Sequence, residues 1–596
     1  MTTVDPSQLA VITAPADQWI RVEAGPGSGK TEVIARRVAR LLDADFAPAE
    51  IVVMTYTRAM AAELKRRIAL HKPDAVPCRG CVGSQCDCGG GGRIFVGMDA
   101  LNIGTMHSLA SGWVRSMLEA HFDRERDFGR TMRAAGAAIV EMGWVTGPDF
   151  AFADEAMVQT MLGEVRRRLG KKNYRVLRQI AGLKLTGAAL SARPVEAELR
   201  LMLRENGMVG LDDVLAMFAV GVEATRGGWG RLYPCLIVDE AQDMAAPQRA
   251  VVDAWRPRHA LLVGDDGQSI MRFLGAPAPP LPDGYVTMTL GANHRARPEL
   301  VAYTNALRAT IASAGACSPL VQAASRHGGG SVWEMEPVDE VTGIVDVVFD
   351  LVSRGVRAES IAILVATWDE VTHVVEALRR VGVDANIPLR RGGSWVGAPA
   401  ARALITLMRA CERGSITAIE LAVLLRSTSL AAGIVSAAYE GGRSLANEMR
   451  ERGTPVTGAT HVAGALLLAH ERGIGILEPD PDPALVPALN WMVQNPTAMV
   501  GDFLAWVDED DFVASDTTDA VTVATIHAAK GREWPVVVLP HFVEGAMPPL
   551  WARADEDVSE WGRAAYVAAT RARDLLVVAA PMTYKGAQAQ PSRWWR

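Results

Sequence analysis

The stretch AGPGSGKT, residues 24–31, decides the fold of this 596-residue chain. A short apolar run, WIRVEA (19–24), precedes it, and EVIARRVARLL (32–42), which has the apolar spacing of a helix, follows it. Glycines between a strand and a helix let backbone N–H groups turn toward phosphate oxygens, and the N-terminus of the helix adds positive potential. The spacing is that of a P-loop, although Ala24 stands where the strict pattern has its first glycine. The stretch therefore predicts a phosphate-binding turn.

Each residue of this P-loop has an expected role in holding ATP and Mg²⁺. Lys30 should reach the β- and γ-phosphates, and the hydroxyl of Thr31 should ligate Mg²⁺. The backbone of the other residues should surround the phosphates: Ala24, Gly25, Gly27, Ser28 and Gly29.

The segments on either side of the P-loop repeat the alternation of strand and helix. Apolar runs recur at IVVMTY (51–56), LIVDEAQD (236–243) and HALLVGDD (259–266), and the last two end in acidic residues. A second alternating series begins at YVTMTL (285–290) and continues through IAILVA (361–366). Strands that alternate with helices imply parallel sheets, which bind ligands at the carboxyl ends of their strands. We expect an α/β fold with two parallel-sheet cores, each carrying a mostly helical insertion.

The fading of the strand pattern sets the expected domain boundaries. Between the strand series lie long helical stretches, which we assign to the two insertions. The expected order is first core 1–109, with a Cys-rich insertion at 72–93; helical insertion 110–215; first core again 216–284; second core 285–395; helical insertion 396–518; second core again 519–596.

Composition excludes several classes of protein. The length implies several domains, and no run of about 18 uncharged apolar residues predicts a membrane span. The N-terminus lacks the pattern of a secretory signal, and seven mostly clustered cysteines do not form a disulfide scaffold, so we expect a cytoplasmic protein. The net charge of −7 argues against a uniformly basic surface but allows a local basic channel. The basic run at 163–184 could bind DNA phosphates or form a solvated helix face.

Two adjacent carboxylates end the strand at VDEAQD (238–243). Asp239 suits the ligand shell of Mg²⁺, and Glu240 suits activation of the water that attacks the γ-phosphate. An acidic strand end by itself is often a solvated loop, but together with a P-loop it predicts nucleotide hydrolysis.

An ordered series of motifs over nearly the whole chain resembles the UvrD/Rep-type superfamily 1A DNA helicases. Besides AGPGSGKT and VDEAQD, the series is QLAV (8–11), MTYTRAMAAEL (54–64), GTMHSLA (104–110), VGDDGQSIMRFLGA (263–276), NHRARPEL (293–300), TIHAAKGREWPVVVLP (525–540) and YVAATRARDLLVV (566–578). The resemblance implies two RecA-like P-loop NTPase cores, each with an inserted accessory domain. It also implies an ATP-dependent motor that moves 3′ to 5′ along single-stranded DNA and unwinds duplexes at single-strand/double-strand junctions, in repair or replication.

The same resemblance implies roles around the nucleotide. Gln8 is similar to the glutamine that reads the adenine edge, and His294 stands where the family usually stacks a tyrosine on adenine. Gln268 is similar to the sensor of the γ-phosphate, and Glu533 to the glutamate that contacts the ribose. The second core would supply two arginine fingers, Arg295 and Arg571, which stabilise charge on the γ-phosphoryl group.

The resemblance also implies DNA contacts. Tyr56, Phe273 and Trp594 match aromatic positions on which the family stacks bases, although each could instead be a core residue. Thr105 and His107 resemble the motif that holds the DNA backbone, and we place His527 on the same path.

Besides His294, two features depart from the family pattern. Met271 and Leu274 flank Phe273 where two large aromatics and an arginine are usual, and the second insertion is short. These departures bear on stepping and strand separation rather than on ATP hydrolysis. The chain stops soon after its last motif, so we expect neither a partner-binding tail nor a nuclease domain.

Four of the seven cysteines lie in VPCRGCVGSQCDCGGGG (76–92), between two motifs that the family joins more directly. Four thiolates suffice for a tetrahedral zinc site, although a Cys-x-Cys pair strains chelation of one metal. Three alternatives stay open: zinc, an iron–sulfur cluster, or reduced thiols on a loop. His71 could replace a poorly placed ligand. The candidate ligands are Cys78, Cys81, Cys86 and Cys88.

Two other functions compete with that of an unwinding motor. One is a translocase that strips proteins or senses DNA ends within a repair or phage-defence complex. The other is a nucleotide-gated regulator, against which the full set of catalytic residues argues. The sequence identifies no protein partner.

Overall fold

The computed structural model describes most of both predicted cores. The described residues are 4–44, 46–72, 101–123, 129–145, 151–153, 194–205, 208–270, 284–312, 322–323, 330–339, 342–387, 520–552 and 555–595, with isolated residues between them. The Cys-rich stretch, the basic run at 163–184, Phe273 and nearly all of the second predicted insertion lie outside these residues.

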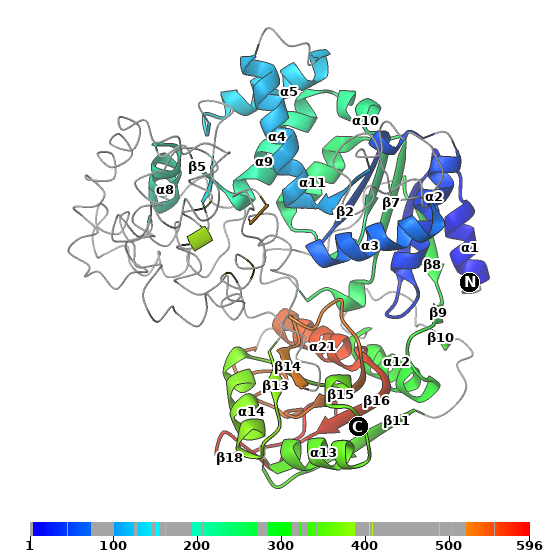
Figure 1. Cartoon of the computed structure of the whole chain (residues 1–596), viewed down its shortest axis with the longest axis vertical. Helices are drawn as coiled ribbons and strands as arrows, with labels where there is room; N and C mark the ends of the chain where they lie inside the picture. The colour runs from blue at the N-terminus through cyan, green and yellow to red at the C-terminus, as the bar shows by residue number, and fades with distance from the viewer. Residues whose placement is uncertain are drawn as a thin grey trace, which may run out of the picture.

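The first core is built on a six-stranded parallel sheet with the order β3-β2-β6-β7-β1-β8. β2 and β6 are buried along their whole length, as expected for parallel strands covered on both faces. Figure 1 shows this core, in blue and cyan-green, above the second core. Its strands are β1 (Trp19–Ala24), β2 (Ile51–Thr55), β3 (Asn102–Thr105), β6 (Cys235–Val238), β7 (His259–Gly264) and β8 (Val286–Leu290).

Helices cover both faces of the first sheet. One face packs against α1 (Pro6–Thr13), α2 (Lys30–Asp43) and α3 (Arg58–His71), and the short η1 (Pro48–Glu50) leads into β2. The opposite face packs against α4 (Met106–Phe122), α5 (Gly129–Glu141), α9 (Leu211–Ala224), α10 (Gly228–Leu232) and α11 (Ala246–Trp255). Further out lie β4 (Ala151–Ala153), α8 (Pro194–Glu205) and β5 (Met208–Gly210), where β4 and β5 pair in parallel (Figure 1).

Two helices of the predicted insertion at 110–215, α4 and α5, pack together with α9. The ring of Trp113 in α4 stacks on Phe218 of α9 at 5.2 Å between centroids. Trp113 also meets Trp229 and Trp255 edge-on, at 5.5 and 5.6 Å. These rings belong to the hydrophobic core that covers the sheet, so α4, α5 and α9 are part of the first core. The boundary expected at residue 216 falls inside α9.

The predicted division between the cores at residue 285 is also wrong. β8 pairs in parallel with β1, so it completes the first sheet instead of opening the second core. β8 is an edge strand, and its residues are mostly exposed. The next segments, β9 (Ala292–Asn293) and β10 (Gln322–Ala323), pair with each other in parallel.

The second core is a six-stranded parallel sheet with the order β11-β16-β15-β12-β14-β13. α12 (Pro298–Ala312) and α21 (Asp555–Ala569) pack on one face, and α13 (Thr342–Ser353) and α14 (Trp368–Arg380) on the other. Its strands are β11 (Ser331–Met335), β12 (Ile361–Val365), β13 (Ala385–Asn386), β14 (Val521–Thr525), β15 (Trp534–Leu539) and β16 (Ala572–Ala579). The short η8 (Ala358–Ser360) precedes β12, and an antiparallel hairpin, β17 (Thr583–Tyr584) and β18 (Ala587–Gln588), follows β16.

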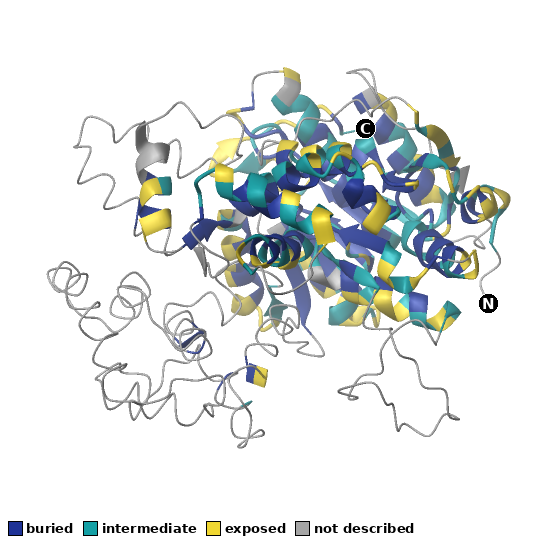
Figure 2. Cartoon of the chain, turned by 90° about the horizontal axis from the view of Figure 1, so that it is seen from above, coloured by how far each residue is buried: buried dark blue, intermediate teal, exposed yellow. Residues whose placement is uncertain are grey.

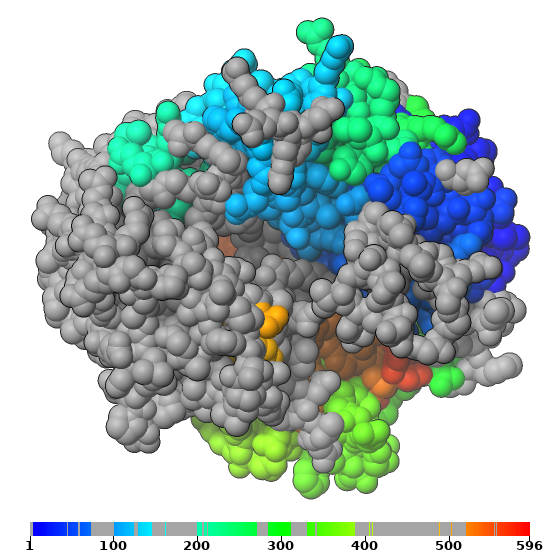
Figure 3. Space-filling view, turned by 45° about the horizontal axis from the view of Figure 1, so that its top comes forward, coloured from blue at the N-terminus to red at the C-terminus, as the bar shows by residue number. Residues whose placement is uncertain are grey.

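The two parallel sheets confirm the predicted fold class of two RecA-like α/β cores. Seen from above, buried strands fill the centre and the exposed residues lie on the outer surfaces of the helices (Figure 2). In the space-filling view, the blue first core lies above the green and orange-red segments of the second (Figure 3). Across the described ranges, no helix is long and apolar enough to cross a membrane.

Candidate nucleotide site between the two cores

The P-loop connects the buried strand β1 to helix α2. Gly29 precedes α2 with a φ of 80°, and Gly27 has a φ of 71°, both in the left-handed region that favours glycine. A Cβ atom at Gly27 would lie 2.5 Å from Asn293 Oδ1 and 2.6 Å from Arg295 Cβ. The backbone N–H of His294 donates to the Gly27 carbonyl at 2.8 Å. The loop is therefore packed against the segment that connects the two cores.

Two buried carboxylates end β6 opposite the P-loop lysine. Lys30 Nζ lies 3.9 Å from Glu240 Oε1, and the Asp239 and Glu240 residues are 5% and 8% exposed. Burial, together with the charge of Glu240, raises the pKa of Asp239. Burial acts to raise the pKa of Glu240 as well, but nearby cations, Lys30 first among them, hold it well below its usual range. Glu240 is therefore an ionised carboxylate at neutral pH.

The residues at this edge fit a bound Mg²⁺. Asp239 is buried, and within the described part of the chain it has no ion-pair partner, whereas Lys30 pairs with Glu240. Carboxylate and hydroxyl oxygens are the donors that Mg²⁺ prefers, and a cation would offset the burial of the Asp239 charge. Thr31, the second residue of α2, supplies such a hydroxyl. No cluster of three or more His, Cys, Asp or Glu residues that could hold a metal occurs among the described residues.

A chain of hydrogen bonds joins the carboxylates to the second core. Gln242, in η5 (Ala241–Asp243), donates to Glu240 Oε2 at 2.6 Å and accepts from the Asp265 backbone N–H at 3.0 Å. Gln268, at the end of η6 (Asp266–Gln268), donates to Asp265 Oδ2 at 2.7 Å. Arg571, which precedes β16, donates to Gln268 Oε1 at 2.9 Å. The chain thus brings Glu240, Gln268 and Arg571 into one connected site.

The two predicted arginine fingers have different surroundings. Arg571 is 2% exposed and also donates to the backbone carbonyls of Val567 and Arg532. Burial and the nearby charge of Arg295 lower the pKa of Arg571 to about 9, so it stays charged at neutral pH. Arg295 forms an ion pair with Glu533, the residue expected to contact the ribose. Arg295 also lies close to the P-loop, since its Cβ is 2.6 Å from where a Cβ atom at Gly27 would be.

Gln8 and His294 lie together beside the P-loop. The side-chain oxygen of Gln8 accepts from the Asp5 N–H at 3.2 Å, and its amide nitrogen donates to the Ser28 carbonyl at 2.9 Å. His294 Nε2 lies 2.9 Å from Asp5 Oδ2, the carboxylate that caps α1. Both ends of the Gln8 amide therefore bind protein here, and adenine would have to replace at least one of these contacts.

Lys530 is a residue that the sequence reasoning missed. Its Nζ pairs with the carboxylate of Asp243 and donates to the Gln268 carbonyl at 2.7 Å. Burial raises the pKa of Asp243 to about 6, although Lys530 opposes this effect. Both residues lie inside motifs quoted above. The sequence signal that could have identified Lys530 was that it is a lysine inside such a motif with no role assigned to it.

The expected DNA residues lie partly at the carboxyl edge of the first sheet. Tyr56 follows β2 and Thr105 ends β3, and these two strands are neighbours with Thr55 opposite Thr105. The Thr105 hydroxyl accepts from the Ser108 N–H at 3.3 Å and so caps α4, in whose first turn His107 lies. Tyr56, Thr105 and His107 are half-buried.

His527, from the second core, is also half-buried. Its ring lies 6.2 Å from that of Trp561. Burial, with a contribution from Lys530, lowers the pKa of His527 to about 4, so the ring is neutral at pH 7.

The placement of Trp594 contradicts its assignment as a stacking surface for DNA. Trp594 is 7% exposed and belongs to the hydrophobic core of the second domain. Its ring lies 3.1 Å from where a Cβ atom at Gly562 of α21 would be. A buried ring offers no face to a base, so Trp594 is a core residue in this structure.

The candidate zinc ligands lie outside the described residues, but His71 at the end of α3 is described. His71 Nε2 lies 2.9 Å from Glu32 Oε1. The residue proposed as a substitute ligand therefore already has a partner, on α2.

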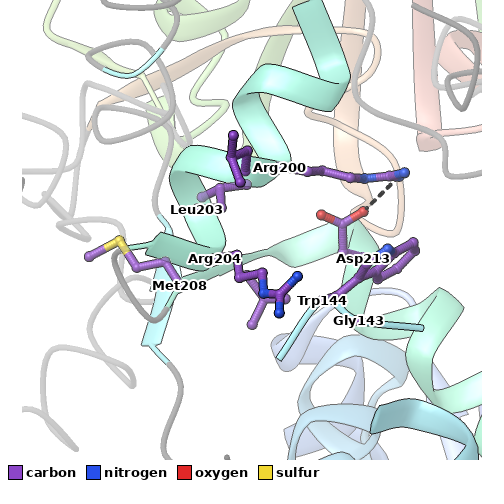
Figure 4. A pocket seen from close by; sticks show the side chains of 9 residues that line it. Gly143, Trp144, Arg200, Leu203, Arg204, Met208 and Asp213 are labelled. Carbon is purple, nitrogen blue, oxygen red and sulfur yellow. Dashed lines mark hydrogen bonds and ion pairs between the residues drawn. The ribbon is translucent and has the colours of Figure 1, made fainter. Parts of the chain in front are cut away.

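A separate cavity of about 210 Å³ lies where α8 meets α9 (Figure 4). The guanidinium of Arg200 lies 4.4 Å from the ring centre of Trp144 and donates to Asp213 at 3.2 Å. Arg204 and Met208 also line the cavity. Because Arg200 already has both partners, we interpret this cluster as packing between α8 and the first core.

Two parallel α/β cores, a P-loop on one and a buried arginine reaching the same site from the other define a P-loop ATPase. Sequence comparison narrows this class. Residues 4–281 match the model of the UvrD/REP helicase N-terminal domain, and residues 502–582 match that of the UvrD-like helicase C-terminal domain. The chain belongs to the UvrD/Rep helicase family and is therefore an enzyme of the DNA helicase class.

Several named helicases are similar to the chain. The ATP-dependent DNA helicase UvrD2 of Mycobacterium tuberculosis is 26% identical over 612 residues, which cover 96% of this chain and 77% of the relative. The ATP-dependent DNA helicase PcrA of Leuconostoc citreum is 42% identical over 103 residues, 16% of this chain and 14% of the relative. The ATP-dependent DNA helicase srs2 of Schizosaccharomyces pombe is 54% identical over 56 residues, 9% of this chain and 6% of the relative.

Proposed function

We propose that the chain is a DNA-dependent ATPase that moves 3′ to 5′ along single-stranded DNA and unwinds duplexes at single-strand/double-strand junctions. One observation carries the proposal: Arg571 of the second core donates to Gln268 of the first at 2.9 Å. A site completed by residues from both cores is complete only when the cores are together. ATP turnover is then linked to opening and closing, which is the motion that a translocating motor needs.

Within this proposal, the residues of the site divide the work of hydrolysis. Lys30 and the P-loop backbone would bind the phosphates, and Thr31 and Asp239 would hold Mg²⁺, which would neutralise phosphate charge. The ionised carboxylate of Glu240 accepts the proton of the attacking water. Gln268 senses the γ-phosphate. Arg295 and Arg571 stabilise the negative charge that develops on the γ-phosphoryl group.

The sensing of the nucleotide base and sugar is assigned to the residues beside the P-loop. Gln8 and His294 would meet adenine, and Glu533 would meet the ribose. In the structure these three bind Ser28, Asp5 and Arg295. Nucleotide binding would therefore exchange protein contacts for nucleotide contacts, and release of Glu533 would leave Arg295 available to the phosphates.

The DNA path is assigned to residues at the carboxyl edges of both cores. Tyr56, Thr105 and His107 would bind the strand on the first core, and His527 on the second. Because His527 is neutral at pH 7, its contact with DNA would rest on stacking or hydrogen bonding rather than on charge. Phe273, outside the described residues, keeps its assignment from the sequence.

Tailed duplexes test the proposal. ATPase activity should rise with single-stranded DNA, and a duplex with a 3′ tail should be unwound while a duplex with a 5′ tail should not. Preferential unwinding of the 5′-tailed duplex would refute the assigned polarity. DNA-stimulated ATPase without unwinding of either duplex would support instead a translocase that works within a repair or phage-defence complex.

Zinc binding by Cys78, Cys81, Cys86 and Cys88 is a second part of the proposal, and it rests on the sequence alone. Protein purified without added metal should contain zinc, and replacing Cys78 and Cys81 by Ser should remove it. Cys235, which is fully buried in β6, is the matched control, since its replacement should leave the zinc content unchanged. Less than about half an equivalent of zinc in the unmodified protein would refute the proposal.

A further inference from the structure

A fully buried ion pair connects the two cores outside the set of residues assigned above. Arg308, on α12 of the second core, donates from Nη2 to Asp265 Oδ1 at 3.3 Å. Asp265 follows β7 of the first core, and both side chains are 0% exposed. A buried charge is costly unless it is paired, so closing the cores with this geometry requires both partners.

Asp265 also fixes the orientation of Gln268. Its Oδ1 accepts from the Gly267 backbone N–H at 3.0 Å, and its Oδ2 accepts from the Gln268 side-chain nitrogen at 2.7 Å. An ionised carboxylate only accepts hydrogen bonds, so the amide nitrogen of Gln268 must face Asp265. The amide oxygen therefore faces Arg571, which donates to it at 2.9 Å.

The second core also packs on the turn that carries Gln268. The guanidinium carbon of Arg308 lies 5.6 Å from the ring centre of Tyr566 in α21. A Cβ atom at Gly267 would lie 3.4 Å from Tyr566 Cε1 and 3.5 Å from Arg308 Nε. The turn at 265–268 is thus held from one side by Arg308 and Tyr566 and meets Arg571 through Gln268.

We propose that Arg308 is a positioning residue for ATP hydrolysis, which acts through Asp265 to hold Gln268 in its working orientation only when the cores are closed. The inference rests on the role given to Gln268 in the proposed function. When the cores separate, Asp265 loses its cationic partner Arg308, and Gln268 loses Arg571. Because the Arg308 side chain is fully buried, its role would be indirect.

The test compares Arg308→Met in two backgrounds by steady-state ATPase with saturating single-stranded DNA. In the wild-type background, kcat should fall roughly ten- to a hundredfold, as expected for loss of a charge-assisted hydrogen bond, with KM for ATP within about twofold. In a Gln268→Ala background, adding Arg308→Met should change kcat by less than about twofold, because the group that it positions is gone. Arg354→Met is the matched control, since Arg354, which follows α13, is exposed and pairs with Asp350 of that helix.

The outcomes separate the inference from the proposed function. A normal kcat in Gln268→Ala alone refutes the role of Gln268. Suppose that Gln268→Ala lowers kcat and that adding Arg308→Met lowers it again by the same factor as in the wild-type background. That result refutes the positioning role, since a merely structural ion pair would affect kcat in both backgrounds. If Arg308→Met does not fold, Arg308→Lys carries the same comparison: it keeps the charge but lacks the planar fork that both bonds Asp265 and lies over Tyr566. A wild-type kcat in Arg308→Met, or in Arg308→Lys where Arg308→Met does not fold, overturns the inference.

Discussion

Replacing Glu240 by Gln should abolish hydrolysis while preserving ATP binding. The substitution keeps the size of the side chain, and the carbonyl oxygen of the new amide can still accept from Gln242, which donates to Glu240 at 2.6 Å. What the substitution removes is the ionised carboxylate that accepts the proton of the attacking water. Loss of a general base lowers kcat by roughly 10²- to 10⁴-fold.

The effect on ATP binding follows from the ion pair with Lys30. Lys30 Nζ lies 3.9 Å from Glu240 Oε1, and both side chains are mostly buried, so at an effective dielectric constant of about 20 their attraction is about 4 kcal/mol. ATP phosphates must compete with Glu240 for this ammonium. Neutralising Glu240 removes that competitor, so the Kd for ATP should stay the same or fall.

Two assays and one control decide the outcome. Steady-state turnover with saturating single-stranded DNA gives kcat, and titration with a fluorescent ATP analogue gives Kd. Glu376→Gln, at an exposed position of α14, makes the same chemical change away from the site and should match the wild type in both. A kcat for Glu240→Gln within about threefold of wild type would refute the assigned base. A Kd that rises as much as kcat falls would refute the geometry at Lys30.

Three further substitutions test separate parts of the structure. Gly27→Ala should weaken ATP binding at least about tenfold, because φ is 71° and the new Cβ would lie 2.5 Å from Asn293 Oδ1; unchanged nucleotide titrations would show that the loop shifts freely. Burial lowers the pKa of His259 in β7 from 6.5 to about 4, so the unfolded chain binds a proton there before the folded one does, and stability should fall as the pH drops from 6.5 to 4. In denaturant titrations, His259→Gln should reduce the loss of unfolding free energy between pH 6.5 and 4 by roughly 3 kcal/mol. An unchanged loss would contradict this prediction. Trp594→Ala should lower the unfolding free energy by roughly 3–5 kcal/mol and leave the DNA affinity of the folded protein unchanged; the reverse pattern would restore Trp594 to the DNA path.

Local sequence patterns predicted the elements of both cores but not which sheet each strand joins. The apolar runs at IVVMTY and LIVDEAQD became the fully buried strands β2 and β6. YVTMTL was also correctly expected to be a strand, yet it joined the first sheet as β8. The periodicity and composition of a strand indicate whether its faces are buried. The sheet that the strand joins depends on its pairing with a segment distant in the sequence, which for β8 is β1.

The helical insertion at 110–215 shows the same limit for helices. An amphipathic helix has the same spacing whether its apolar face meets other helices or a sheet. Trp113 and Phe218 gave no sequence signal that they would stack on each other over the first sheet, because they are separated by more than 100 residues. The resemblance to a family with accessory domains then favoured a separate domain, whereas α4 packs with α9 in the hydrophobic core of the first sheet.

The same limit applies to the candidate site. Residues at strand ends were predicted from the sequence, whereas a residue on a helix was not. Asp239 and Glu240 end β6, and the P-loop follows β1, so a motif at a strand end predicts where its side chains lie. Arg308 lies within α12, where an arginine between apolar residues has the pattern of a solvated helix face. Only the approach of the two cores buries it against Asp265. Catalytic residues at strand ends can therefore be predicted from sequence motifs. A residue such as Arg308, which is proposed to link the chemistry to closure, is identified only by its contact between the two cores in the structure.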